Sequence, residues 1–171
     1  MTGPLIDEEP AEHHRYRRYL QALDEATESD EAELVTTVLR DEDATMAESA
    51  VNRHLEFRAT RLLTDPAFTT WAQAMATAIG DRPFLVRRLQ EWALLRTIAL
   101  DEPWTTEELT TASEWFQRTA SSSRFITSRR ALTLLAEQGR TRRVRDTASG
   151  RLPQPAHPRC IDHGRGSPPI L

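Results

Sequence analysis

Apolar side chains recur along most of this chain at the spacing of an α-helix. Near the N-terminus, the residues Tyr16, Tyr19, Leu20 and Leu23 lie at positions i, i+3, i+4 and i+7, which places them on one helical face. No long stretch alternates apolar and polar residues with the period of two that a half-buried strand shows. The pattern predicts an all-α protein of seven to eight helices, without a substantial sheet.

The segment from Pro83 to Phe116 concentrates the large apolar side chains of the chain. In its first half, apolar residues cover most of the helical circumference, and the polar residues form one narrow strip: Arg87, Gln90, Glu91 and Thr97. A helix that is apolar on nearly all sides is usually buried. We therefore predict that the helix beginning at Pro83 is the central one and that Trp92 lies in the core.

The helix that follows has the best-defined start in the sequence. Thr105 and Glu108 form a T-x-x-E capping box, in which each side chain bonds a backbone amide of the other residue. Trp104 and Leu109 occupy the hydrophobic-staple positions on either side of this box. These motifs predict one helix from residue 106 to about residue 120.

Residues 31–63 resemble one HEAT-type repeat unit. Two expected helices flank an L-x-D-x-D turn at Leu39 to Asp43, and Met46 and Ala50 match the apolar and alanine positions of the second helix. HEAT-like proteins are mostly scaffolds and adaptors, so the resemblance implies a helical stack with a binding surface.

The resemblance does not extend into a regular array. Glu42 replaces the proline that is common in the turn, and Ala47 replaces the arginine that is common early in the second helix. Similar turns recur at Asp65 and Asp101, which lie 24 and 60 residues beyond Asp41. Because these spacings are unequal, the fold is expected to be an irregular multi-helix bundle or an irregular HEAT-like helical stack.

Length and composition fit a single domain with two tails. The chain has 171 residues, of which 39% are hydrophobic and 28% are charged, enough for one domain with a substantial core. Residues 1–10 contain Gly3, Pro4, Pro10 and an acidic cluster at 7–9, and residues 148–171 have no helical periodicity. We expect a disordered N-terminus at 1–10, one helical domain at 11–147 and a disordered tail at 148–171.

The charges are distributed unevenly. Residues 1–117 contain 11 arginines and 23 acidic residues, whereas residues 118–171 contain 11 arginines and 3 acidic residues. Seven arginines lie in one segment near the C-terminus: Arg124, Arg129, Arg130, Arg140, Arg142, Arg143 and Arg145. We predict that these seven residues bind an anion or an acidic partner.

Several functional classes have no support in the sequence. The chain contains no G-x-S-x-G, H-E-x-x-H, C-x-x-C or Walker motif, so we expect a protein that is not an enzyme and has no cofactor. His157, Cys160 and His163 offer three zinc ligands without a credible fourth, so no metal site is expected. The acidic N-terminus, the single cysteine and the lack of a long apolar run predict a cytoplasmic protein without a membrane partner.

Four polar residues are expected on inward-facing helical stripes: His54, Arg58, Arg88 and Arg96. We expect the histidine to be a hydrogen-bonded core residue, the alternative being an acid or base. Because an unpaired charge in a core is costly, Arg88 and Arg96 should pair with carboxylates such as Glu56 or Glu114. The alternative is that the three arginines surround an anionic ligand.

An acidic body with a basic C-terminal segment predicts a non-enzymatic interaction or regulatory protein, an adaptor that binds a protein partner. The alternative is a DNA-binding transcriptional regulator with nucleic acid as its partner. In that hypothesis the helices starting near Thr106 and Ser128 form a helix-turn-helix, with Arg129 and Arg130 near the start of the recognition helix. The connection at 121–126 is longer than the usual three or four residues and contains no glycine. The sequence makes no prediction of the oligomeric state.

Overall fold

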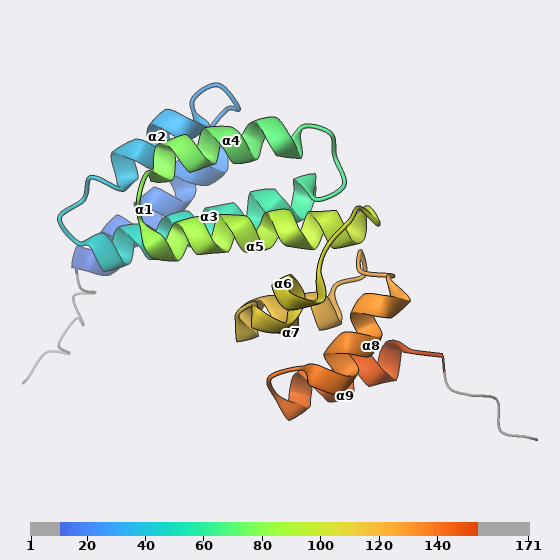
Figure 1. The fold of residues 1–171 in the computed structure, drawn as a ribbon. Coiled ribbons are helices and arrows are strands. Elements are labelled where there is room, and N and C mark those ends of the chain that lie inside the picture. The colour runs from blue at the N-terminus through green and yellow to red at the C-terminus, as the bar shows by residue number, and fades with distance from the viewer. Residues whose placement is uncertain (1–10, 154–171) are drawn as a thin grey trace, which may run out of the picture.

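The computed structural model describes residues 11–153, and this part of the chain forms nine α-helices and no strand (Figure 1). The helices are α1 (Ala11–Glu25), α2 (Glu31–Val38), α3 (Ala44–Leu62), α4 (Phe68–Ile79), α5 (Pro83–Ala99), α6 (Thr106–Thr111), α7 (Glu114–Ser122), α8 (Arg129–Gln138) and α9 (Arg142–Arg151). The prediction of an all-α multi-helix protein is confirmed, although the helices outnumber the seven to eight expected. Residues 1–10 and 154–171, both predicted to be disordered, lie outside the described residues.

The last helix continues past the boundary expected from the sequence. Helix α9 extends to Arg151, beyond the domain end predicted at residue 147. Ala148 is fully buried on this helix, and the Arg151 guanidinium donates to the carbonyl of Ile126 at 2.6 Å. A small apolar residue and a long-range hydrogen bond therefore hold a segment whose composition alone indicated a tail.

Helix α5 is the centre of the fold. Helices α1 to α5 form the upper part of the molecule in Figure 1, and α6 to α9 lie beneath α5. Helix α5 packs against α3 and α4 in the upper part and against α7 in the lower part. Leu85, Leu95 and Ile98 on α5 are at most 2% exposed, and Trp92 is 4% exposed. The predicted central helix and the core position of Trp92 are confirmed.

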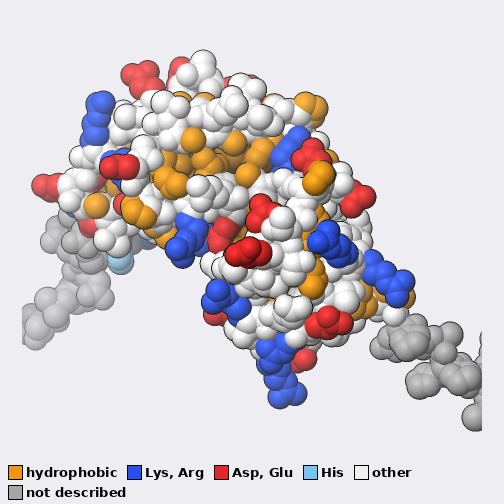
Figure 2. All heavy atoms as spheres, in the orientation of Figure 1, with side chains coloured by type: hydrophobic (Ala, Val, Ile, Leu, Met, Phe, Trp, Pro, Cys, Tyr) orange, Lys and Arg blue, Asp and Glu red, His pale blue; other side chains and the backbone are white. Residues whose placement is uncertain are grey.

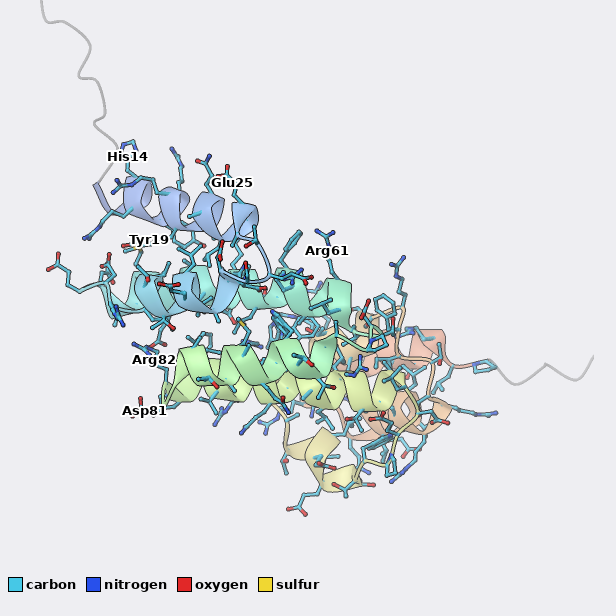
Figure 3. The ribbon with its side chains drawn as sticks, turned by 90° about the horizontal axis from the view of Figure 1, so that it is seen from above. His14, Tyr19, Glu25, Arg61, Asp81 and Arg82 are labelled. Atoms are coloured by element: carbon cyan, nitrogen blue, oxygen red, sulfur yellow. The ribbon has the colours of Figure 1, made fainter. Side chains whose placement is uncertain are left out.

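Helix α1 covers one side of α3 and also fixes the connection between α2 and α3. The Tyr19 hydroxyl donates to Asp41 Oδ2 at 2.6 Å, and the Arg15 guanidinium lies 3.8 Å from the other oxygen of this carboxylate. The view from above shows α1 beside the α2 and α3 layer, with Tyr19 between them (Figure 3). These contacts join the first helix to the turn that the HEAT-like resemblance singled out, and α2 itself packs mainly against α4.

The helix predicted from residue 106 to about residue 120 is broken in two. The capping box at Thr105 and Glu108 forms as predicted, but the chain is extended at residues 112 and 113, with ψ values of 159° and 161°. Ser113 caps the new helix α7 by accepting a hydrogen bond from the amide of Phe116. The buried Gln117 side chain donates to the carbonyl of Leu109 at the end of α6. These side chains satisfy the backbone groups that a break exposes, and the break adds a helix to the expected number.

Candidate functional site

The seven arginines predicted to bind a partner occupy two separate places. Arg124, Arg129 and Arg130 lie between α7 and the first turn of α8, and the other four lie in the turn after α8 and in α9. Helix α8 has ten residues, so its start is about 15 Å from that turn. Figure 2 shows basic side chains projecting at the lower edge of the molecule, over α8 and α9. The structure does not gather the seven residues into one patch.

Two of the seven arginines stabilise helix ends. Arg140 donates from Nε to the carbonyl of Ala112 at 3.0 Å and from Nη2 to that of Thr111 at 3.2 Å, at the end of α6. Arg145 donates from Nη1 to the carbonyl of Gly139 at 2.7 Å, at the end of α8. The last carbonyls of a helix lack intrahelical donors and attract cations. The positive charges of Arg140 and Arg145 are therefore used within the fold.

The other five arginines of the segment are exposed, as is Arg140, whereas Arg145 is partly buried. The Arg124 and Arg130 guanidinium groups lie 4.9 and 4.2 Å from the ring centres of Phe125 and Trp104. Arg142 pairs with Asp146 at 3.5 Å, but the two side chains are 89% and 70% exposed, so the pair contributes little to stability. The remaining two, Arg129 and Arg143, make no side-chain hydrogen bond or ion pair within residues 11–153.

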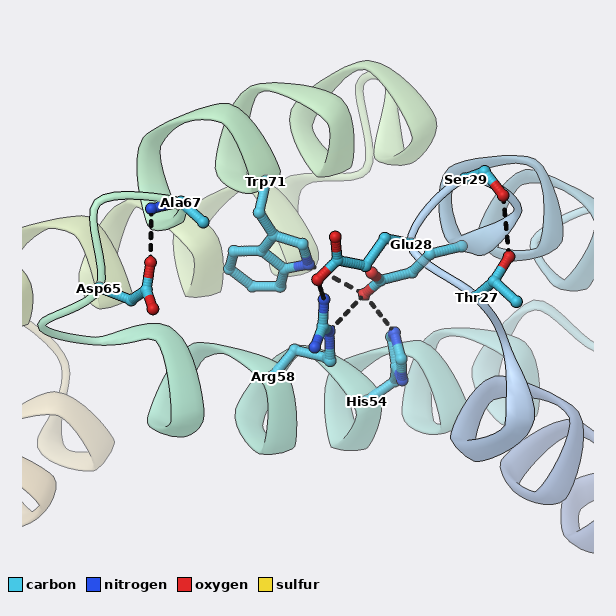
Figure 4. Close-up of polar contacts among 9 residues, drawn as sticks. Thr27, Glu28, Ser29, His54, Arg58, Asp65, Ala67 and Trp71 are labelled. Carbon is cyan, nitrogen blue, oxygen red and sulfur yellow. Dashed lines mark hydrogen bonds and ion pairs between the residues drawn. The ribbon is translucent and has the colours of Figure 1, made fainter.

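A buried polar centre joins α2, α3 and α4 (Figure 4). Glu31 Oε1 lies 2.7 Å from His54 Nε2 and accepts hydrogen bonds from Arg58 Nε at 3.1 Å and Trp71 Nε1 at 2.9 Å. Glu31 and His54 are both 4% exposed. The prediction that His54 is a hydrogen-bonded core residue is confirmed.

The centre holds Glu31 in its ionised form. Burial by itself raises the pKa of this carboxyl group, but the hydrogen bonds from His54, Trp71 and Arg58 outweigh burial and lower the pKa to about 2. An ionised carboxylate only accepts hydrogen bonds, so His54 Nε2 carries the proton between the two groups. The other ring nitrogen, Nδ1, is buried and has no partner within residues 11–153. Among residues 11–153, no serine or threonine side chain makes a hydrogen bond to Glu31 or His54.

Sequence reasoning found His54 and Arg58 but missed Glu31 and Trp71. Glu31 belongs to an acidic run and looked like an exposed first-turn residue. A signal was nevertheless present, because Glu31 lies four and seven positions before Val35 and Val38, the buried stripe of α2.

The three inner arginines do not surround a common ligand site. Arg88 pairs with Glu91 at 3.4 Å and donates to Asn52 at 3.2 Å, and its guanidinium carbon lies 3.5 Å from the ring centre of Trp115. Burial lowers the pKa of Arg88, and the neighbouring Glu91 opposes this effect. Arg96 instead donates to the carbonyl of Leu63 at 2.6 Å, at the end of α3. Arg88 thus pairs with a carboxylate other than the Glu56 or Glu114 expected from the sequence. For Arg96 the prediction is wrong, because its partners are backbone carbonyls.

Glu91 was expected on the polar strip of α5 but is only 7% exposed. Its Oε1 atom accepts a hydrogen bond from the amide of Ser113 at 3.0 Å, where the chain is extended between α6 and α7. Glu91 therefore faces this neighbouring segment, whereas Arg87 and Gln90 of the same strip are exposed.

No group of three or more His, Cys, Asp or Glu residues among residues 11–153 is arranged to hold a metal ion. The trio His157, Cys160 and His163 lies outside that range. No helix in the described part of the chain is long and apolar enough to cross a membrane. Comparison of the chain with known protein families, curated proteins and solved structures gives no match.

Proposed function

We propose that this protein is a non-enzymatic interaction or regulatory protein that binds an acidic protein partner through the start of α9. The proposal rests on a difference between two pairs of arginines within residues 140–145. Arg140 and Arg145 donate to helix-end carbonyls, whereas Arg142 and Arg143 project into solvent, where they contribute little to the fold. Exposed charges of this kind steer the association of proteins with opposite charge.

The charge distribution supports a partner that approaches from the C-terminal end of the described chain. Residues 114–153 contain 9 arginines and 3 acidic residues, a net charge of +6. Residues 11–113 contain 11 arginines and 19 acidic residues, a net charge of −8. A long polyanion such as duplex DNA would be repelled by the larger acidic part, whereas a compact acidic surface can contact the basic end alone.

A DNA-binding regulator remains the second candidate, because one feature of the structure favours it. Helices α8 and α9 are joined by residues 139–141, a three-residue connection that begins with Gly139. This is the connection length of a helix-turn-helix, unlike the longer connection between α7 and α8 that the sequence suggested. Arg142 and Arg143 then occupy the first turn of the second helix, where such proteins contact bases. Asp146 lies one turn later and would repel phosphate.

The test compares two double variants. Arg142→Gln with Arg143→Gln removes the exposed charges of α9, and Arg40→Gln with Arg87→Gln removes two exposed arginines elsewhere whose side chains make no hydrogen bond within residues 11–153. A partner is first identified by cross-linking to the wild-type protein and is then purified. Its association rate, measured by surface plasmon resonance, should fall in the α9 variant, depend on salt and stay unchanged in the control.

DNA binding is measured in parallel by fluorescence anisotropy with duplex DNA. We expect only weak binding at physiological salt, equal in the two double variants. Sub-micromolar binding that the α9 variant abolishes would replace the proposal with the DNA-binding alternative. An association rate that is equal in both double variants would remove α9 as the contact surface.

A further inference from the structure

A cavity of about 230 Å³ opens between α2, α3 and α4, beside the buried polar centre. Its charged lining consists of Glu28, Glu31 and Arg58, and most of the remaining wall is apolar, including Trp71 and Met75. A few convergent polar groups in an apolar wall are typical of small-molecule sites. The helices that line it, α2, α3 and α4, lie in the upper part of Figure 1, away from α9, so its ligand is independent of the proposed partner surface.

One oxygen of the buried carboxylate in this lining has no partner. Glu31 Oε1 takes part in all three contacts of the centre, with His54, Arg58 and Trp71 (Figure 4). The second oxygen, Oε2, accepts no hydrogen bond from any residue between 11 and 153. The Glu31 side chain is only 5% exposed, but Oε2 is not one of the fully buried side-chain atoms that lack a partner within residues 11–153, so solvent reaches this oxygen. A ligand that brings an N–H donor into the cavity can bond this oxygen in place of water.

The charges of the lining leave one negative charge unbalanced. Arg58 is the single cationic residue of the lining, and Glu28 and Glu31 are both acidic. The Arg58 Nε atom donates to Glu31 at 3.1 Å, and its Nη2 atom lies 3.8 Å from Glu28 Oε1. A ligand with one positive charge makes the lining neutral, whereas an anion makes the imbalance larger.

We propose that this cavity binds an organic ammonium ion with a single charge and a small apolar body. The ammonium group donates to Glu31 Oε2 and lies near Glu28, and the apolar body packs against Trp71 and Met75. An engineered cavity of about 150 Å³ holds benzene, so this larger cavity accommodates one ring with a short aminoalkyl arm.

Isothermal titration calorimetry of the full chain with 2-phenylethylammonium chloride tests the proposal. The neutral isostere 2-phenylethanol and the anion phenylacetate separate charge from apolar contact. We expect a submillimolar dissociation constant for the ammonium ion, weaker binding of the alcohol and no binding of the anion. Added salt should weaken ammonium binding, because part of the attraction comes from the exposed Glu28.

Three variants locate the site. Ala74→Leu fills the cavity from an exposed position on α4 and removes no charge, so it should abolish ammonium binding. Glu28→Gln removes a carboxylate whose side chain is 87% exposed, so binding should weaken by about two- to fivefold. Glu33→Gln removes an exposed carboxylate of α2 that is not in the lining, and binding should stay unchanged.

Equal affinity for the ammonium ion and the alcohol would overturn the proposal, because the cavity would then be an apolar void. Phenylacetate binding more tightly than 2-phenylethylammonium would also overturn it. So would a titration in which millimolar 2-phenylethylammonium releases or absorbs no heat of binding. Unchanged affinity of the Ala74→Leu variant for 2-phenylethylammonium would overturn it as well.

The ammonium group could belong to a free amine or to a lysine side chain of a partner protein. Titration with Nα-acetyllysine amide, which carries the lysine side chain, distinguishes these two sources. If Nα-acetyllysine amide binds more tightly than 2-phenylethylammonium, the ligand is a lysine side chain of a partner. If it binds more weakly, the ligand is a free amine.

Discussion

Glutamine in place of Glu31 tests how much the buried carboxylate contributes to stability. Folding lowers the pKa of Glu31 from 4.5 to about 2, and each unit of pKa difference between the unfolded and folded states corresponds to about 1.4 kcal/mol. The ionised carboxylate therefore adds about 3 kcal/mol to the free energy of unfolding at neutral pH. Loss of one partner of a buried ion pair costs about 3 to 5 kcal/mol, so both routes predict a loss of about 3 kcal/mol for Glu31→Gln.

The loss should depend on pH in one direction. Glu31 takes up a proton near pH 4.5 in the unfolded chain but only near pH 2 in the folded chain. Because the folded pKa is the lower of the two, the stabilisation is complete above pH 4.5 and disappears as the pH falls towards 2. The difference in stability between the wild type and Glu31→Gln should therefore shrink across this interval.

Urea unfolding followed by far-ultraviolet circular dichroism measures the free energy of unfolding at each pH. Glu33→Gln is the matched control, since Glu33 lies on the same helix and is exposed. Its stability should follow that of the wild type at every pH. A loss below about 1 kcal/mol for Glu31→Gln, or a difference that stays constant as the pH falls, would refute the assigned role of the charge.

Two further predictions concern packing and helix ends. Trp92→Ala should lower the free energy of unfolding by about 3 to 5 kcal/mol, because Trp92 is 4% exposed and packs edge-on against Trp115 at 5.4 Å; a loss below about 1 kcal/mol in urea unfolding would contradict its core position. Arg140→Ala should cost about 0.5 to 1 kcal/mol, because it removes two exposed hydrogen bonds and a cation at the end of α6, whereas Arg143→Ala should leave the midpoint of thermal unfolding nearly unchanged. Equal midpoints for these two variants would show that the helix-end hydrogen bonds of Arg140 are not stabilising.

The features that the sequence determined are local. The helical period predicted the all-α class, the capping box predicted the start of α6, and the continuous apolar surface predicted that α5 is central. Each of these signals lies within a few residues of the element that it specifies. Hydrogen bonds of a helix and its cap join positions three or four apart, so they can be inferred without knowing how helices pack.

Only the tertiary structure decided which charged residues serve the fold and which face solvent. Glu31 meets His54, Arg58 and Trp71 across sequence separations of 23, 27 and 40 residues, and Arg140 reaches the end of α6 across 28. In the sequence, Arg140 and Arg143 look alike, since both belong to the same basic run. They differ because the packing of neighbouring helices brings backbone carbonyls within reach of Arg140 but not of Arg143. Such hydrogen bonds join residues that are far apart in the sequence, so only the tertiary structure shows which polar groups have a partner.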